Sequence, residues 1–407
     1  MSSLPIAVLL PHGPVTSVAP AVVTEHEQPG LLATLAVMPD PRDPRGVRYP
    51  LASVLAVAVC AVMAGAVTFA AIADWLRDLD SSGWARLGFT DRIPVASTVW
   101  RLLVRVDAEV LSTVLAGWLC ARNTATSMPR PVDDRRWRRV IAIDGKVLRG
   151  SRLPDGAPVH LLSAYDTGTG VVLAQVQIAA KSNEIPAFTP LLDRVQAQLG
   201  SLNGVIIVAD ALHAQTGHAR EVAVRGAHLM VTVKANQPTL HNLLKALPWA
   251  EVPVGDRRRD HGHGRQETRT VKALSDRTPG GLGFPHAEQA VRITRTRTVK
   301  GKTSRETAYL VASLPAEHAQ PDQLQDWARL EWHIENRLHW IRDVTLREDA
   351  HLARTGNGPA VAAVLRNTAI GYHRINGETN IARATRRANR RPHDLIDAVT
   401  RSNPTTQ

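Results

Sequence analysis

Two short apolar runs that each end in an aspartate constrain the fold of this chain most strongly. Residues 140–143 (VIAI) run directly into Asp144, and residues 204–209 (GVIIVA) run directly into Asp210. Such runs, rich in β-branched residues and bounded by turn signals, are typical of strands that are buried on both faces of a sheet. An unpaired carboxylate there is costly to desolvate, so a divalent cation is the usual partner. Asp144 taken alone is more often a strand-end residue that turns into a loop.

The elements around these aspartates predict an α/β fold. Residues 160–166 and 170–178 flank a glycine-bearing loop and indicate a β-hairpin. Residues 185–199 have the period of an amphipathic helix, residues 216–225 form a second helix, and residues 228–234 form a fifth strand. The order β-β-β-α-β-α-β resembles the ribonuclease H-like fold, in which the first and fourth strands lie side by side. This topology makes the loop interpretation of Asp144 the weaker one.

A third acid lies in a tryptophan-rich segment, residues 326–343, with the period of a helix. The residues that recur there at three- and four-residue steps, and so share one packed side, are Trp332, Glu335, Leu338, His339 and Arg342. An acid on the packed side of a helix is unusual unless it is ligated. Glu335 alone could equally form an ion pair with Arg337 or Arg342. Glu331, one turn earlier, could share its face or a salt bridge with it.

Three carboxylates that converge on one point repel each other, so cations must neutralise them. Oxygen ligands suit Mg²⁺ or Mn²⁺ better than zinc. Two such ions, about 3.5–4 Å apart, activate a water or a 3′-hydroxyl and stabilise the leaving oxygen of an in-line displacement. Asp144, Asp210 and Glu335 therefore predict cleavage and rejoining of phosphodiesters.

The charge of the chain agrees with a polyanionic partner. Its 407 residues include 49 Lys and Arg against 37 Asp and Glu, a net charge of +12, which points to nucleic acid first and to an anionic membrane second. Residues 51–73 carry no charge and are long enough to span a bilayer, but their many alanines favour a buried helix of a soluble bundle. Two cysteines are too few for a disulfide framework, and no cleavable signal peptide is evident, so we expect a cytoplasmic protein.

Shifts in composition predict five segments. The chain is divided into a flexible leader (1–30), a small all-α domain for DNA binding or assembly (31–123), a catalytic domain (137–236 and 316–375), a β-rich basic insertion (237–315) and a basic C-terminal tail (376–407), with a polar linker at 124–136. His261 and His263 in the insertion lack further ligands nearby, which favours a solvated turn over a zinc site.

Several motifs together resemble one branch of the DDE-class insertion-sequence transposases, the branch that contains the H-repeat-associated proteins. They are IDGK (143–146), KSNE (181–184), DALH (210–213), HGR (263–265), WHIENRLHW (332–340) followed by DVT (343–345), and in the helical region PDPR (39–42) with Ser97 and Thr98. The resemblance covers roughly residues 31–372.

It implies a transposase that depends on Mg²⁺ or Mn²⁺, with two ions held by Asp144, Asp210 and Glu335, and that cuts DNA at element ends and joins them to a target. A homodimer on DNA, association with the nucleoid and the absence of a membrane partner are expected with it. The candidate DNA contacts are Lys146, Arg149, Arg265, Arg342, Arg386 and Arg387. A DDE-like nuclease without strand transfer, a DNA-binding relic without catalysis and a membrane-inserted protein remain alternatives.

Glu184 is expected beside the metal pocket, in the first turn of the helix after the third strand. There it either complements the positive end of the helix or helps to hold the second ion.

Overall fold

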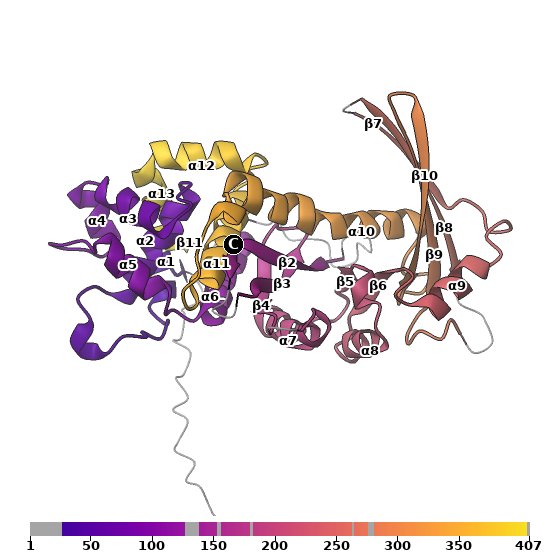
Figure 1. The fold of residues 1–407 in the computed structure, drawn as a ribbon, viewed down its shortest axis with the longest axis horizontal. Helices are drawn as coiled ribbons and strands as arrows, with labels where there is room; N and C mark the ends of the chain where they lie inside the picture. The colour runs from indigo at the N-terminus through magenta and orange to yellow at the C-terminus, as the bar shows by residue number, and fades with distance from the viewer. Residues whose placement is uncertain are drawn as a thin grey trace, which may run out of the picture.

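The computed structural model describes residues 27–126, 138–152, 156–179, 182–262, 264–275 and 281–404 (Figure 1). Most of the expected leader and linker, together with Lys181, His263 and residues 405–407, lie outside the described residues. The strands are β1 (Glu27–Gln28), β2 (Val140–Arg152), β3 (Pro158–Asp166), β4 (Val172–Gln177), β5 (Ile206–Ala209), β6 (His228–Val233), β7 (Asp256–Gly262), β8 (Arg265–Ser275), β9 (Gln289–Val299), β10 (Lys302–Ala312) and β11 (Asn403–Pro404).

The α-helices are α1 (Leu31–Leu35), α2 (Leu51–Met63), α3 (Phe69–Arg77), α4 (Ser81–Arg86), α5 (Ala96–Leu103), α6 (Ala108–Thr126), α7 (Phe188–Leu199), α8 (Thr216–Val224), α9 (Pro238–Ala246), α10 (Pro321–Ile334), α11 (Gly358–Ile375), α12 (Ile381–Arg390) and α13 (Pro392–Thr400). Two π-helical turns follow α10, namely η4 (Glu335–His339) and η5 (Ile341–Thr345). Short 3₁₀ turns are η1 (Pro44–Gly46), η2 (Ile185–Ala187), η3 (Ala211–His213) and η6 (Glu348–Ala350).

The predicted order of strands and helices around the two aspartates is confirmed. β2, β3 and β4 form an antiparallel meander, and β2 pairs in parallel with β5, which pairs in parallel with β6. The first and fourth strands of this unit therefore lie side by side, as the ribonuclease H-like fold requires. Because parallel strands need crossovers, α7 and α8 connect β4 to β5 and β5 to β6.

Alternating side chains of the central strands supply two apolar layers. On β2, Ile141 and Ile143 join the cluster that contains α7 and α8, whereas Val140 and Ala142 join the cluster that contains α10. Helices thus cover both faces of the parallel core, which is why its strands are apolar throughout. The period of two continues along the strand, so Asp144 points to the side of α10.

The predicted β-rich insertion continues the central sheet. β10 pairs antiparallel with β6, and the sheet runs on through β9, β8 and β7 to give nine strands in the order β4-β3-β2-β5-β6-β10-β9-β8-β7. In Figure 1 the far ends of β7–β10 rise from the body as a twisted arm. His261 is exposed at the end of β7, in agreement with a solvated site.

The uncharged segment 51–73 forms parts of two helices, so the prediction of one continuous helix is wrong. Gly65, with φ +99°, follows the end of α2, and the Thr68 side chain accepts a hydrogen bond from the Ala71 N–H at the start of α3. Nearly every residue of α2 is buried against α11, α1 and α3. Among the described residues, no helix combines the length and the apolar character that crossing a bilayer demands.

Residues 376–404 of the expected basic tail are mostly helical. α12 and α13 pack on the N-terminal helices: Leu395, Ile396 and Val399 of α13 are buried in the same apolar cluster as α1 and α2. β11 pairs with β1, so residues 403–404 lie beside residues 27–28.

Candidate active site

β2 and β5 bring Asp144 and Asp210 to one edge of the sheet. Ile143 is the register partner of Ala209, so the two aspartates follow at the same level on neighbouring parallel strands. Both also continue the alternation toward α10. The Asp210 carboxylate accepts a hydrogen bond of 2.9 Å from the Leu212 N–H, which fixes it at the start of η3.

Glu335 is placed by a change of winding in the long helix over this edge. α10 ends at Ile334, and in η4 and η5 each carbonyl accepts from a residue five positions on: the Trp340 N–H donates to Glu335, and the Leu346 N–H donates to Ile341. π-helical turns are rare in proteins, and those that do occur are often found at functional sites. They change which side chains face the core.

The predicted packed side of this helix is therefore partly wrong. Leu338, His339 and Arg342 are buried as expected, but Trp332 is 58% exposed and the Glu335 side chain is 61% exposed. The two residues that depart from the prediction are Trp332, on the last turns of the regular helix α10, and Glu335, where the π-helical winding begins. Glu335 thus lies at the edge of the packed side, where His339 links its carboxylate to Asp144 on β2.

His339 joins the acid on the helix to the acid on the strand. Its Nδ1 lies 3.1 Å from Glu335 Oε2 and 3.5 Å from Asp144 Oδ2. One ligand atom from each of the three residues lies within 4.8 Å of the other two. Glu335 therefore pairs with His339, and the expected alternative of an ion pair with Arg337 or Arg342 is not found among the described contacts.

Burial and the neighbouring acids raise the pKa of Asp144. Burial contributes most, the carboxylates of Glu184, Asp210 and Glu335 add to it, and the Gly145 N–H hydrogen bond opposes it, which leaves the pKa at about 8. A cation bound beside these carboxylates would favour their charged forms. The site thus has the electrostatics of a cation-binding cluster of acids.

Glu331 extends this acidic cluster one turn along α10. Burial raises its pKa to about 7, with a further contribution from Asp210, and Lys234 opposes the shift. The pKa of Glu335, by contrast, is lowered by its hydrogen bond with His339. Glu331 therefore interacts electrostatically with Asp210, whereas Glu335 is linked to Asp144 through His339.

Comparisons with known families agree with this geometry. The family described as "Transposase DDE domain" matches residues 136–371, which is more than half of the chain. The chain belongs to this DDE transposase family. A second description, "DDE_Tnp_1-associated", matches residues 32–119, the helical N-terminal region.

Relatives of this transposase share most of its length. "Putative transposase YncI" of Escherichia coli O157:H7 is 29% identical over 366 residues, which are 84% of this chain and 87% of that protein. "H repeat-associated putative transposase YhhI" of E. coli K12 is 28% identical over 361 residues, 84% of this chain and 89% of that protein. The expected resemblance to the H-repeat branch is confirmed. The piggyBac transposase in a synaptic complex with hairpin DNA aligns at a TM-score of 0.40 and 11% identity, covering 91% of this chain and 77% of that one, too distant to carry an argument.

Glu184 lies beside the acids of this transposase, on the other side of β2. Its Oε1 is 3.1 Å from His160 Nε2 and its Oε2 is 3.2 Å from His213 Nε2. Burial raises the pKa of Glu184, but hydrogen bonds from the two histidines outweigh it and hold the pKa at about 2. A Cβ on Gly145 would collide with this carboxylate, so the missing side chain at Gly145 leaves room for Glu184 and His160.

Two of the six candidate DNA contacts, Lys146 and Arg342, have buried side chains that form ion pairs within the protein. Lys146 Nζ forms a 2.6 Å salt bridge with Asp343 on η5. Arg342 is fully buried, and its Nε lies 2.8 Å from Glu348 Oε2, while Arg366 lies 3.3 Å from the other carboxylate oxygen, Glu348 Oε1. These cations fasten the π-helical segment to β2 and α11. The candidates that do lie on the surface are Arg149, Arg265, Arg386 and Arg387.

Sequence reasoning missed the roles of His339 and Asp343. His339 had been expected only as a packing residue, although it follows Glu335 by four positions, a spacing at which side chains on a helix meet. The Lys146–Asp343 pair joins positions far apart in the chain, so no local sequence pattern predicts it.

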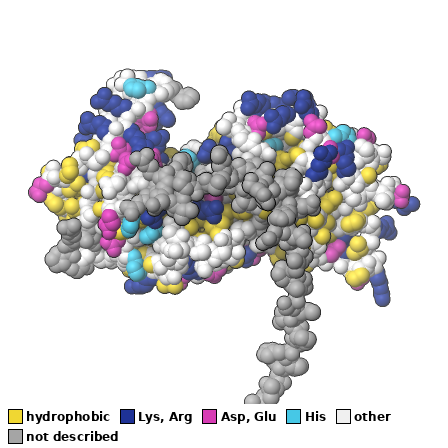
Figure 2. All heavy atoms as spheres, turned by 180° about the vertical axis from the view of Figure 1, so that it is seen from behind, with side chains coloured by type: hydrophobic (Ala, Val, Ile, Leu, Met, Phe, Trp, Pro, Cys, Tyr) yellow, Lys and Arg dark blue, Asp and Glu magenta, His cyan; other side chains and the backbone are white. Residues whose placement is uncertain are grey.

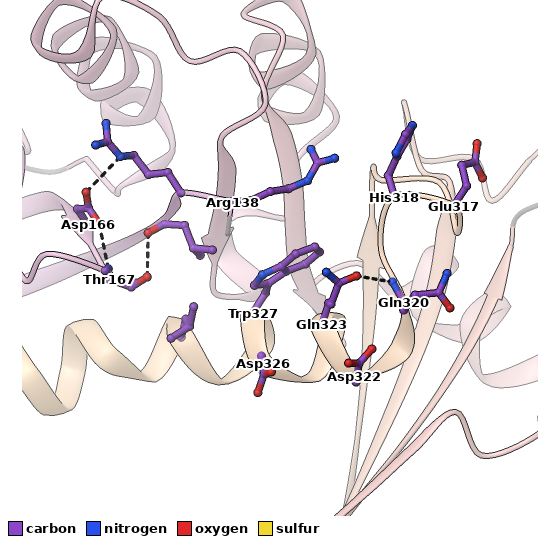
Figure 3. A pocket seen from close by; sticks show the side chains of 14 residues that line it. Arg138, Asp166, Thr167, Glu317, His318, Gln320, Asp322, Gln323, Asp326 and Trp327 are labelled. Atoms are coloured by element: carbon purple, nitrogen blue, oxygen red, sulfur yellow. Dashed lines mark hydrogen bonds and ion pairs between the residues drawn. The ribbon is translucent and has the colours of Figure 1, made fainter. Parts of the chain in front are cut away.

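A large cavity lies at the start of β2, and none of Asp144, Asp210 and Glu335 lines it. It has a volume of about 790 Å³ and is lined by the start of β2, the end of β3 and the first turns of α10 (Figure 3). Trp327 and Gln323 point into it from α10, and Asp166 forms a 3.3 Å ion pair with Arg139 at its rim. Ligands of open α/β sheets bind at the carboxyl ends of the strands, where Asp144 and Asp210 lie.

Proposed function

We propose that this protein is an Mg²⁺- or Mn²⁺-dependent transposase that cuts DNA at element ends and transfers the strands into target DNA. Asp144, Asp210 and Glu335 are the catalytic carboxylates of this proposal. The observation that carries it is that Asp144 on β2 and Glu335 on the helix bring carboxylate oxygens within 4.8 Å of each other, with Asp210 following the neighbouring strand β5 at the same level.

The donor set fits hard divalent cations. Carboxylate oxygens from Asp144, Asp210 and Glu335 would hold two ions, which would supply charge neutralisation and an activated oxygen nucleophile for in-line displacement at phosphorus. His339 holds the Glu335 carboxylate toward Asp144, and the Lys146–Asp343 salt bridge keeps the π-helical segment against β2. The protein thereby orients its acids in advance, as metal-site residues outside the ligand set commonly do.

The distribution of charge supports DNA as the partner. Figure 2 shows Lys and Arg side chains gathered on the projecting arm of β7–β10 and again on the part of the molecule away from the arm, where α12 lies. On α12 the exposed arginines are Arg383, Arg386, Arg387 and Arg390. Positive side chains on both sides of the acidic site suit a duplex that crosses it. A homodimer on DNA and association with the cytoplasmic nucleoid are part of the proposal.

Cleavage of a DNA substrate by purified protein tests the proposal. The substrate carries one end of the element with its flanking DNA, and cut positions are mapped in the presence of Mg²⁺. Asp144→Ala, Asp210→Ala and Glu335→Ala should each abolish cleavage but retain DNA binding, because the acids position metal and not DNA. Asp193→Ala, at an exposed acid on α7, is the matched control and should cut normally.

Three results would contradict parts of the proposal. Cleavage at the wild-type rate by Asp210→Ala would refute the assignment of the acids. Cutting without joined products would indicate a nuclease, and binding without any cutting by the wild-type protein would indicate a catalytically inactive relative.

A further inference from the structure

Two tryptophans on the helix that carries Glu335 face solvent. Trp332 is 58% exposed and Trp340 is 55% exposed, whereas Trp118, Trp249 and Trp327 are buried. Tryptophan is highly buried on average, and large exposed apolar groups mark interaction sites when they cluster. Val344, also exposed, follows Trp340 by four positions. The apolar stripe therefore continues into η5.

The two tryptophans flank Glu335 along the helix. The Glu335 N–H donates to the Trp332 carbonyl, and the Trp340 N–H donates to the Glu335 carbonyl, so one tryptophan lies a turn before Glu335 and the other a turn after it. On η4, Leu338 and His339 are buried, whereas the next residue, Trp340, is exposed. Asn336, which lies between the two tryptophans in the sequence, donates from its Nδ2 to the Trp332 carbonyl at 3.0 Å.

The charge beside this stripe identifies its partner. α12 packs against η5, and its exposed face carries Arg383, Arg386 and Arg387. Arg347, exposed in the left-handed conformation (φ +49°), follows η5. Aromatic rings next to a cationic surface are the composition of sites that bind unpaired nucleotides, where bases stack on the rings and arginines follow the phosphates.

We propose that Trp332 and Trp340 stack on unpaired bases of the DNA strand whose phosphate reaches Glu335. This inference rests on the proposed function and adds a ligand class to it, an unpaired DNA end. A stacked base on either side of Glu335 holds the adjoining phosphodiester at the acids and keeps the end of the duplex open. A second copy of the chain on the same stripe is the competing occupant, since tryptophan is also common in protein interfaces.

Binding to two otherwise identical DNA probes tests this directly. One fluorescein-labelled duplex is fully paired, and the other carries three mismatched pairs at the element end, both with Ca²⁺ in place of Mg²⁺. Stacking contributes about 1–3 kcal/mol per base, so wild-type protein should prefer the mismatched probe by roughly 5- to 150-fold. Trp332→Ala and Trp340→Ala should each reduce this preference but leave the affinity for the paired probe within about twofold.

Two variants control for folding and chemistry. Trp100→Ala, at a partly exposed tryptophan on α5, should keep the full preference. Trp340→Phe, which keeps a stacking ring, should retain most of it. A 2-aminopurine placed in the mismatched end should be quenched by the wild type and less so by the alanine variants.

An equal loss of affinity for both probes, or an unchanged preference in both alanine variants, would overturn the inference. A change in sedimentation of the DNA-free protein on Trp340→Ala, with the preference intact, would assign the stripe to a second copy. The binding test and the cleavage test are independent of each other. If the protein prefers the mismatched probe but never cuts DNA, the proposed function is refuted and the stacking is not. If it cuts DNA but does not prefer the mismatched probe, only the stacking is refuted.

Discussion

Replacing Glu348 by glutamine should destabilise the protein by about 3–5 kcal/mol, the usual cost of removing one partner from a buried ion pair. Glu348 is 2% exposed and neutralises two buried guanidinium groups, Arg342 at 2.8 Å and Arg366 at 3.3 Å. The three side chains carry a net charge of +1 in the wild type and +2 in the variant. Glutamine keeps the shape and one acceptor but removes the negative charge that both guanidinium groups contact.

The same residue predicts a dependence on pH. Burial raises the pKa of Glu348, but Arg342 and Arg366 outweigh it, so the pKa in the folded protein lies below its ordinary value. A carboxyl with a lowered pKa contributes stability above the pKa of the unfolded chain, about 4.3. That contribution is lost as the pH falls through the folded pKa. The difference between wild type and Glu348→Gln should therefore be full at pH 7 and shrink in acid.

Urea denaturation followed by circular dichroism measures the effect. Glu306→Gln is the matched control, because Glu306 forms a 2.8 Å pair with Arg295 but is 68% exposed. An exposed pair contributes about 0–1 kcal/mol, so the control should unfold almost as the wild type does. Equal midpoints for Glu348→Gln and Glu306→Gln would refute the reasoning.

Further predictions concern the surroundings of the acids and the basic helix. Gly145→Ala should cost about 1–3 kcal/mol in thermal melts, because the new Cβ overlaps the Glu184 carboxylate, whereas Gly262→Ala meets nothing within 4 Å and should melt as wild type. Glu184→Gln should lower the free energy of unfolding by about 1.5–3 kcal/mol, because histidines contact both carboxylate oxygens. It should not change the Mg²⁺ concentration needed for half-maximal cleavage, and an increase in that concentration would identify Glu184 as a metal ligand. Arg386→Gln combined with Arg387→Gln should lower the salt slope of DNA binding by about 1.8, and an unchanged slope would show that α12 does not contact DNA.

The positions of Asp144 and Asp210 were predictable because the alternation of side chains along a strand depends only on neighbouring residues. A run of apolar residues with a period of two places Asp144 and Asp210 on the same side, and the order of elements makes their strands neighbours. Both inferences require only short-range patterns and the rules of chain connection. The β-rich insertion was visible for the same reason, as alternation in residues 291–300.

The surroundings of Glu335 were less predictable because they depend on tertiary contacts. Helical periodicity predicted one packed side, which is correct for His339 but wrong for Trp332, a residue of the regular helix α10 that is 58% exposed. An arginine next to an acidic site suggests a DNA contact, but Arg342 is buried by an ion pair with Glu348. The sequence shows a charge and cannot show which buried group compensates it.

The pairing of β1 with β11 and the burial of α13 against α1 have a consequence for synthesis. Leu395, Ile396 and Val399 complete an apolar core that also contains Leu31 and Leu35, near the opposite end of the chain. A nascent chain therefore cannot finish packing its first helices until residues near 400 have left the ribosome, and such long-range contacts form slowly. An interrupted copy of the gene that stops before Leu395 should yield a polypeptide with exposed apolar helices, a substrate for proteases, and not a folded fragment that competes for DNA.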